Sequence, residues 1–434
     1  MTFSSARPPA AERALGLEFY VTPSRGVPGR IKATADGFRV TEISSYPKPD
    51  PAGPFTVLRV TSSNWEQHEL ASAIARRLGL PPHAVAWSGT KDRRAVAERL
   101  FSYRGPPPDR ELGLREVELL EAYRARDGLV LGHHFGNAFE IRVDDLPDPP
   151  SEAVGRYRAI ETELRAAGGF PNFFGPQRFG EVRPITQEVG RWIVRGDVAR
   201  AVEVYLSDRP EGGTTGVGDD ARRAYGTHHD PARALREFPP EYTFERTLLE
   251  HLARGHPPER AFRALSRDLR LLFVHAFQSL LFNRWLSRRA AAGLPLTEPV
   301  DGDRILRVGR DGTYRSQEAV PVGSDNRTEC VDLVRRGGAT VAGPLVGYET
   351  PSTDGPPAEL LESLLNEEGV SRADWKLPRT PEVASRGAWR PILLPTPPLG
   401  IVADPPSVVF RFALAKGAYA TVFLREFLKN GAEN

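Results

Sequence analysis

The alternation of apolar and polar side chains predicts that the first part of the chain is rich in strands. Phe38, Val40 and Glu42 alternate with Arg39 and Thr41, which is the period expected of a half-buried strand. Comparable alternation, or a short apolar run, predicts strands over residues 17–21, 30–43, 55–60, 83–87, 116–123 and 137–143.

Two helices are expected among these strands. Asn64, followed three residues later by Gln67, has the pattern of a helix start, and Gly79 is the expected end. The second helix is expected to begin at Ser151 and to end at Gly168-Gly169. The apolar side chains that predict the two helices are Leu70, Ile74 and Leu78 in the first, and Val154, Tyr157, Ile160 and Leu164 in the second.

The rest of the chain changes character twice. Helical periodicity dominates from Pro184 to about Ala292, interrupted by polar and glycine-rich stretches. Strand signals return over residues 390–394 and 407–414, and a last helix is expected over 418–428. The first part lacks a strict strand–helix–strand repeat, which indicates an α+β fold. Strand-rich ends around a helical middle suggest that one domain is inserted into another.

Composition narrows the class of protein. The 434 residues are 40% hydrophobic and 26% charged, as in an ordinary globular protein, and the net charge of +2 means that any basic surface must be local. The single cysteine excludes a disulfide framework, and the nine histidines show no metal-ligand spacing. No apolar run is long enough for a membrane span, and residues 1–16 read as a mobile tail without the apolar core of a signal peptide. A cytoplasmic protein is therefore expected.

The most informative segment runs from Ser88 to Val96. It places one carboxylate, Asp92, among Lys91, Arg93 and Arg94, directly after a small-residue turn and an expected strand. Nearby positive charge keeps a carboxylate ionised even when it is partly buried, and an ionised, oriented aspartate can act as a nucleophile. The alternative is that Asp92 caps a helix that starts near Arg93, because aspartate is a favoured N-cap residue.

Several segments, in order and spacing, resemble the TruD family of tRNA pseudouridine synthases. The resemblance covers nearly the whole chain after about residue 17. It rests on residues 31–33 with 37–42, and on 89–96, 131–139, 172–180, 275–283, 343–345 and 416–426. Within these segments, GTKDRRAV and NFFGPQRFG are uncommon strings.

The resemblance implies a fold and a reaction. The fold would be a pseudouridine-synthase catalytic domain with a mixed, largely antiparallel sheet, plus an inserted, helix-rich TRUD domain. The corresponding parts are the mobile tail 1–16, the catalytic domain 17–183 with its return segment 385–434, and the insertion 184–384. The reaction would isomerise a uridine of tRNA, typically uridine 13, to pseudouridine without a metal or other cofactor. No membrane and no protein partner is implied. The alternative on the same fold is a non-catalytic RNA-binding protein or RNA chaperone.

The resemblance also implies roles for four residues. The family nucleophile matches Asp92, its basic partner matches Lys32, and its Asn-x-Phe pair matches Asn137 and Phe139. Lys32 across the site would keep Asp92 ionised, and Phe139 would stack on the flipped uracil. The alternative for Phe139 is a place in the sheet core beside Ile141, although Asn137 on the same strand face suits a pocket better.

Two further groups are candidates for RNA contact. In the loop 172–180, Asn172, Gln177 and Arg178 could bind the substrate, or the loop could be a structural elbow. Arg93 is a weaker candidate for the RNA backbone. Arg260, Arg263, Arg267 and Arg270 recur every three or four residues, and in one continuous helix they would form a basic face for phosphates. The alternative is a solvated helix face.

Overall fold

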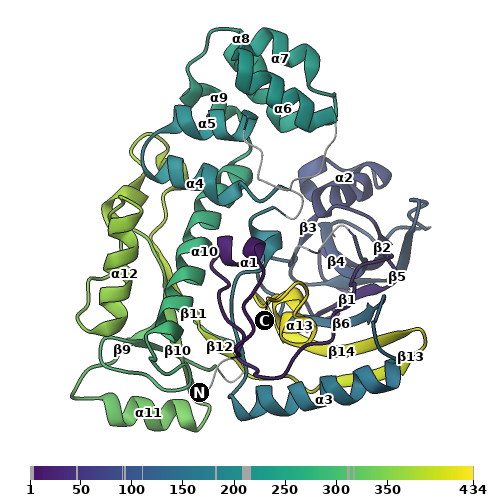
Figure 1. Ribbon diagram of the computed structural model, residues 1–434. Helices are drawn as coiled ribbons and strands as arrows, with labels where there is room; N and C mark the ends of the chain where they lie inside the picture. The colour runs from purple at the N-terminus through teal and green to yellow at the C-terminus, as the bar shows by residue number, and fades with distance from the viewer. Residues whose placement is uncertain are drawn as a thin grey trace.

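The computed structural model describes residues 4–44, 47–89, 91, 94–109, 111–180, 183–207, 217–309, 313–315 and 318–433. Within these residues the strands form one eight-stranded, one four-stranded and one two-stranded sheet (Figure 1). The eight-stranded sheet contains β1 (Phe38–Ile43), β2 (Phe55–Ser63), β3 (Ala86–Trp87), β4 (Val96–Arg104), β5 (Val117–Ala125), β6 (Gly136–Val143), β13 (Gly400–Asp404) and β14 (Ser407–Ala415).

The eight-stranded sheet is mixed and largely antiparallel, as expected. Its order is β13-β14-β6-β1-β4-β2-β5, with β3 beside β4. β1 and β4 run parallel, whereas the other described pairs in this sheet are antiparallel. The return segment therefore supplies one edge of the sheet, through β13 and β14. This arrangement confirms the predicted α+β class.

One face of this sheet is apolar and carries three helices, α2 (Gln67–Arg77), α3 (Pro150–Ala166) and α13 (Ala420–Leu428). The ring of Tyr157 on α3 lies 5.0 Å from that of Phe410 on β14, and Phe427 on α13 lies 5.4 Å from the same ring. α2 packs separately on Leu58 and Phe101. The opposite face carries charged pairs such as Arg59–Glu98 and Arg411–Glu140. A cavity large enough for a substrate can therefore form where these three helices leave the apolar face of the sheet uncovered.

The region between β7 (Phe170–Pro171) and β12 (Leu393–Leu394), which contains the expected insertion, is mainly helical and has a sheet of its own (Figure 1). Its helices are α4 (Thr186–Val194), α5 (Val198–Ser207), α6 (Val217–His228), α7 (Pro231–Glu237), α8 (Thr243–Ala253), α9 (Pro258–Ala264), α10 (Arg267–Ala291), α11 (Arg327–Arg335) and α12 (Pro356–Glu367). Its four-stranded sheet has the order β11-β10-β8-β9, from β8 (Arg304–Arg307), β9 (Val320–Pro321), β10 (Ala339–Leu345) and β11 (Ala388–Pro391).

The helix α10 joins the inserted part to the eight-stranded sheet's layer. Its apolar side chains, among them Phe277 and Leu281, are buried. Asn283 of α10 accepts a hydrogen bond from the Phe174 amide at 2.8 Å and donates to the carbonyls of Leu15 and Phe174, each at 3.0 Å. A polar side chain buried between two segments is stable only when its hydrogen bonds are satisfied. Asn283 thus fixes the loop after the two-residue strand β7 (Phe170–Pro171).

Two neighbouring short strands, β11 and β12, belong to different sheets. β11 pairs with β10 of the inserted part, whereas β12 (Leu393–Leu394) pairs with β7. The change of sheet therefore falls at Ile392. The return segment was expected to begin at residue 385, before β11, but β11 still pairs with β10 of the four-stranded sheet.

The amino-terminal segment differs from the expected mobile tail. α1 (Ala10–Ala14) lies against the rest of the chain, and Glu12 forms an ion pair with Arg425 at 2.6 Å. Arg7 bridges in antiparallel fashion to Glu433. Leu15 is buried in the main core. The prediction was wrong for residues 4–16 because the partners of this polar segment lie at the far end of the chain.

Several predicted elements also differ in their bounds. Residues 17–21 form no strand, although Leu17, Tyr20 and Val21 are buried. β1 begins only at Phe38, and α2 is capped by Glu66 in place of Asn64, whose φ is 59°. The apolar residues 17–21 are therefore buried without forming a strand. Asn64 adopts a left-handed backbone conformation, and the helix cap is Glu66, two residues later.

Candidate active site

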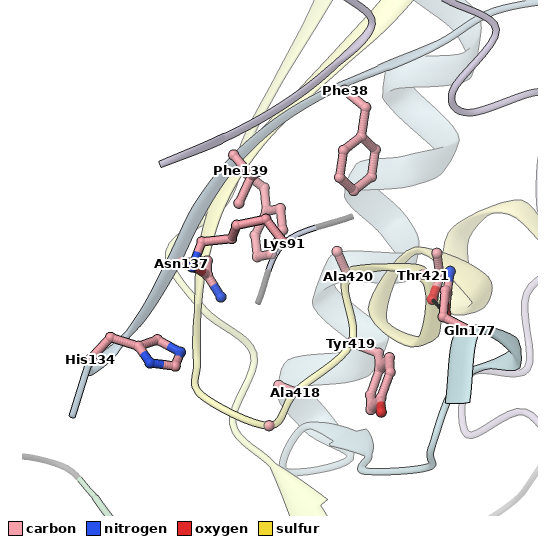
Figure 2. Close-up of a pocket in the computed structure, with 12 residues that line it drawn as sticks. Phe38, Lys91, His134, Asn137, Phe139, Gln177, Ala418, Tyr419, Ala420 and Thr421 are labelled. Carbon is pink, nitrogen blue, oxygen red and sulfur yellow. Dashed lines mark hydrogen bonds between the residues drawn. The ribbon is translucent and has the colours of Figure 1, made fainter. Parts of the chain in front are cut away.

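A cavity of about 280 Å³ opens on the apolar face of the eight-stranded sheet, where β1, β6 and the segment after β14 meet (Figure 2). Its lining residues are Phe38, Val40, Lys91, His134, Asn137, Phe139, Gln177, Gly417, Ala418, Tyr419, Ala420 and Thr421. A pocket of this size, with an apolar wall and a few polar groups, suits a small planar molecule such as a nucleobase.

Strand register brings the wall residues together. In the antiparallel pair β1–β6, Val40 lies opposite Phe139, and Glu42 lies opposite Asn137. Opposed residues project from the same face of a sheet. The sequence placed Asn137 and Phe139 two residues apart on one strand, and the fold adds Val40 and Glu42 of the neighbouring strand to the same face.

Phe139 lies at the boundary between core and cavity. Its ring centroid is 6.1 Å from that of Phe38, edge to face, and 5.4 Å from that of Phe412. Further along the strand Ile141 is fully buried. Phe139 therefore packs on the core with part of its ring and lines the cavity with the rest, so the core placement and the pocket placement coexist.

Asn137 has an unused acceptor. Its side-chain oxygen, Oδ1, is buried and has no hydrogen-bond partner among the residues that the structure describes. A buried polar atom without a partner costs free energy, commonly about 1–3 kcal/mol. Because Asn137 lines the cavity, a ligand that donates a hydrogen bond would remove this cost.

Lys91 and Glu42 form a buried ion pair beside Asn137. Lys91 Nζ lies 2.7 Å from Glu42 Oε2, and each side chain is only 2% exposed. Burial lowers the pKa of Lys91, while the Glu42 carboxylate acts in the opposite direction. The Ser88 hydroxyl donates to the other carboxylate oxygen of Glu42. The segment before Asp92 is thus fixed to β1 by two polar contacts.

His134 closes the same cluster. The Ser88 carbonyl lies 3.0 Å from His134 Nδ1, and the Gly132 amide donates to that carbonyl at 2.7 Å. Burial, and next the Lys91 ammonium, lower the pKa of His134, so its ring is neutral at pH 7. A methyl group on Gly89 would come within 2.9 Å of Lys91 Nζ and of the His134 ring. The small residue at this turn lets the three side chains meet.

Asp92 and Arg93 lie outside the described residues. The chain on either side is described: Lys91 lines the cavity, and β4 begins at Val96, four residues after Asp92. The described residues after Arg93 enter a strand, so the alternative in which Asp92 caps a helix starting there is wrong. That alternative rested only on the general preference of aspartate for the N-cap position.

Lys32, the expected basic partner, is buried and has a left-handed backbone with φ of 56°. Such a conformation is uncommon for residues other than glycine and is associated with functional sites. Its Nζ lies 4.7 Å from the centroid of the Phe38 ring, which lines the cavity. Lys32 is therefore adjacent to the cavity through Phe38.

Residues 417–421 supply a wall of the cavity to which the sequence alone assigned no role. Tyr419, Ala420 and Thr421 line the cavity on the side away from β6 (Figure 2). Thr421 donates to Gln177 Oε1 at 3.0 Å, which places Gln177 in the same wall. The resemblance at 416–426 was the only signal for Tyr419, because an aromatic residue just before an amphipathic helix looks like core.

Asn172 and Arg178 have other positions. Asn172 is buried, donates to the Pro391 carbonyl at 2.9 Å and accepts from Arg390 at 2.6 Å. Arg178 donates to the Ser279 hydroxyl at 3.2 Å and lies over the Phe174 ring. Neither side chain belongs to the cavity lining, so the structure favours the elbow alternative for these two residues, whereas Gln177 reaches the cavity.

The four arginines of the middle region do not share one helix. Arg260 and Arg263 lie on α9 and Arg267 and Arg270 on α10, with a break at Leu265 and Ser266. Arg270 is buried and paired with Glu382. Arg260, Arg263 and Arg267 are exposed. The continuous basic face is therefore wrong, because Ser266 caps a new helix, but three exposed cations remain, two before the break and one after it.

The described part of the chain shows neither a metal-binding cluster nor a helix that could span a membrane. Within it, no three histidine, cysteine, aspartate or glutamate side chains gather as a metal site would require. None of its helices combines the length and the apolar character of a membrane span.

Comparison with known proteins gives a consistent family. Residues 14–427 match the family model described as tRNA pseudouridine synthase D (TruD). The "Probable tRNA pseudouridine synthase D" of Halobacterium salinarum is 39% identical over 96% of this chain and 97% of its own length. The protein of the same name from Thermococcus onnurineus is 35% identical over 95% of this chain and 97% of its own.

A solved structure agrees with the sequence matches. The crystal structure of the "Putative tRNA pseudouridine synthase D (TruD)" from Methanosarcina mazei superposes with a TM-score of 0.80 at 31% identity, over 97% of this chain and 98% of that one. The fold, the cavity and these matches together assign the protein to the isomerases that modify tRNA. The chain belongs to the tRNA pseudouridine synthase D (TruD) family.

Proposed function

We propose that this protein converts a uridine of tRNA, at position 13, to pseudouridine, with Asp92 as the nucleophile. The observation that carries the proposal is the cavity lined by Phe139, Asn137 and Lys91. Lys91 is held by Glu42 and directly precedes Asp92 in the sequence. The family membership gives the reaction class. The position within tRNA and the nucleophile rest on the resemblance of residues 89–96.

The reaction exchanges one bond to the ribose for another. The bond between C1′ and N1 of the uracil breaks, the base turns, and C1′ bonds to C5 of the same base. C5 loses its proton and N1 gains one, so the product is an isomer of the substrate. The Asp92 carboxylate donates an electron pair to C1′ as the C1′–N1 bond breaks, and the resulting bond between Asp92 and C1′ breaks in turn when C1′ bonds to C5, which regenerates the free carboxylate.

The other residues hold the base while it turns. The Phe139 ring offers a stacking surface, which is worth about 1–3 kcal/mol per base and offsets part of the cost of extruding the uridine. The free oxygen of Asn137 can accept from the imide N3–H of uracil. Lys32 and the neutral His134 lie around the same cavity. Tyr419 faces it from the opposite wall (Figure 2).

The proposal is tested in cells. We expect pseudouridine at position 13 of tRNA to be present when the gene is intact, absent when it is deleted, and restored by the wild-type gene but not by an Asp92→Asn copy. Pseudouridine mapping of total RNA measures all three strains. An unchanged map after deletion contradicts the proposed activity, and restoration by Asp92→Asn contradicts the proposed nucleophile.

A further inference from the structure

A second cavity lies beside the proposed uridine pocket. It encloses about 200 Å³, and its wall includes Phe135, Tyr314, Leu345, Trp389, Pro391 and Lys416. Phe135 and Lys416 adjoin β6 and β14 of the eight-stranded sheet, whereas Trp389 and Pro391 lie on β11, the edge strand of the four-stranded sheet. The cavity therefore lies where the eight-stranded and the four-stranded sheets meet.

A ridge two backbones wide separates the two cavities. Gly136 pairs with Ala415, and the Lys416 amide donates to the Phe135 carbonyl at 2.9 Å. Residues of this ridge alternate between the cavities: His134 and Gly417 line the first, and Phe135 and Lys416 line the second. The second cavity is thus one strand pair away from the site proposed for the target uridine.

The wall of the second cavity suits a planar base. Three of its residues, Phe135, Tyr314 and Trp389, are aromatic, and aromatic rings stack on any of the four bases. Trp389 is half-buried, and the Arg304 guanidinium lies 5.0 Å from its ring centroid. Burial raises the pKa of Tyr314, so the phenol keeps its proton and can donate a hydrogen bond.

The charge at the cavity is that expected for a nucleotide site. Its described lining residues include Lys416 and Arg390 and no carboxylate. The Arg390 guanidinium donates a hydrogen bond to the Gly417 carbonyl at 2.8 Å and so fixes the position of the ridge. Lys416 is exposed on the ridge, and its Nζ donates to the Gly132 carbonyl at 2.8 Å. A carbonyl partner leaves the positive charge of Lys416 uncompensated and available to a phosphate.

We propose that the second cavity binds a nucleobase adjacent to the target uridine in the same RNA, with the phosphate between the two nucleosides over Lys416. This inference rests on the proposed function, since it presumes that the first cavity holds the uridine. Sequence-specific recognition of RNA uses bases that are unstacked and splayed apart. Holding a neighbour in its own pocket would keep the strand open while the uridine turns.

Binding measurements test the proposal without any need for turnover. In the Asp92→Asn background, affinity is measured by filter binding for three tRNA transcripts: intact, and abasic on the 5′ or the 3′ side of uridine 13. We expect one of the two abasic transcripts to bind roughly tenfold more weakly, a change that corresponds to about 1.4 kcal/mol and lies within the range for one stacked base. The Trp389→Ala variant should bind the intact transcript more weakly by a similar factor.

The decisive measurement combines the Trp389→Ala variant with the abasic transcript that binds more weakly. If Trp389 and the neighbouring base contact each other, Trp389→Ala should lose no further affinity for the sensitive abasic transcript. The matched control is Trp192→Ala on α4, whose indole lies beside Arg195 and Arg200, away from both cavities, and it should bind all three transcripts unchanged. Losses that multiply, or a folded Trp389→Ala variant with wild-type affinities, would overturn the proposal.

Two provisions keep the test decisive. Should Trp389→Ala not fold, the exposed Lys416→Gln replaces it: we expect weaker binding and a shallower salt dependence, and unchanged values overturn the proposal. Failure of the proposed function appears separately, as wild-type protein that forms no pseudouridine on the intact transcript. The binding results remain interpretable in that case, because they do not depend on product.

Discussion

Lys91 and Glu42 form a buried ion pair at the border of the proposed uridine pocket. This pair restrains the position of the segment that leads to Asp92. A buried ion pair adds little net stability relative to an apolar pair, but removing one partner leaves an uncompensated buried charge. The arrangement therefore acts mainly as a geometric constraint. It fixes Lys91, and with it the start of the segment that carries Asp92, to β1.

Removing either partner should be costly for stability. We predict that Glu42→Gln and Lys91→Met each lower the free energy of unfolding by about 3 kcal/mol or more, and that the double variant loses less than the sum of the two. Urea unfolding at pH 7 of the wild type and the three variants measures this coupling. Additive losses would mean that the two side chains do not depend on each other.

His275 makes stability depend on pH. Burial, then the nearby Arg178 and Arg267 cations, lower the pKa of His275 to about 4. Between pH 6.5 and 4 the unfolded chain therefore binds a proton that the folded protein excludes, so stability is complete above pH 6.5 and falls as pH falls.

The size of this loss can be measured. We expect His275 to account for about 2 kcal/mol of the stability lost between pH 6.5 and 5, from about 1.4 kcal/mol for each pH unit. Urea unfolding at both pH values compares wild type with His275→Gln, whose loss should be smaller by that amount. An equal loss in both proteins contradicts the assignment.

At the scale of elements, α10 sets the position of the loop that follows β7. Asn283 is fully buried and makes three hydrogen bonds to backbone groups of that loop and of the amino-terminal segment. The next residues of the loop include Gln177, which reaches the cavity wall. The helix of the inserted part thus positions a wall of the proposed active site.

Replacement of Asn283 should therefore loosen both the fold and the site. We predict that Asn283→Ala lowers the free energy of unfolding by about 3 kcal/mol, because buried backbone groups lose their partners. The matched control is Asn366→Ala, an exposed position on α12, which should change stability by less than about 0.5 kcal/mol. Urea unfolding measures both, and similar values for the two variants count against this role of α10.

Elements with strong periodicity could be predicted from the sequence, and those defined by distant partners could not. α2, α3 and β6 follow from apolar spacing, and the α+β class follows from their order. The docking of Glu12 on Arg425 and the parallel pairing of β1 with β4 join segments far apart in the chain. Local patterns carry no information about such contacts.

The candidate site shows the same division. Asn137 and Phe139 were expected from one strand, and both line the cavity. The pairing of Lys91 with Glu42 joins two distant segments and became visible only in the fold. Arg270, by contrast, looked like one cation of a series but is buried against Glu382, because a helix break turns it inward.

At the scale of the whole molecule, a net charge of +2 means that RNA affinity must come from local groups of cations. Arg260, Arg263 and Arg267 are the exposed members of the group near the start of α10. The Arg263 guanidinium donates to the Arg379 carbonyl at 2.7 Å and that of Arg267 to the Glu382 carbonyl at 3.1 Å, and both interactions leave the positive charge in place.

These cations should appear in the salt dependence of tRNA binding. We predict that the triple variant R260Q/R263Q/R267Q weakens affinity and makes the slope of log K against log salt shallower, by roughly one unit for each phosphate that the variant no longer neutralises. Arg270→Gln is the control: its partner is Glu382, so it should change stability and leave the slope unaltered. Equal slopes for wild type and triple variant would exclude this surface from RNA binding.

We propose above that the carboxylate of Asp92 carries out the base isomerisation in the cavity beside Phe139. The most direct test of this claim uses purified protein and a tRNA transcript labelled with tritium at C5 of its uridines, because bonding of C5 to the ribose releases that hydrogen. We predict that the wild-type protein releases tritium and that Asp92→Asn binds the transcript but releases none. Release by Asp92→Asn at a rate near that of the wild type would contradict the claim.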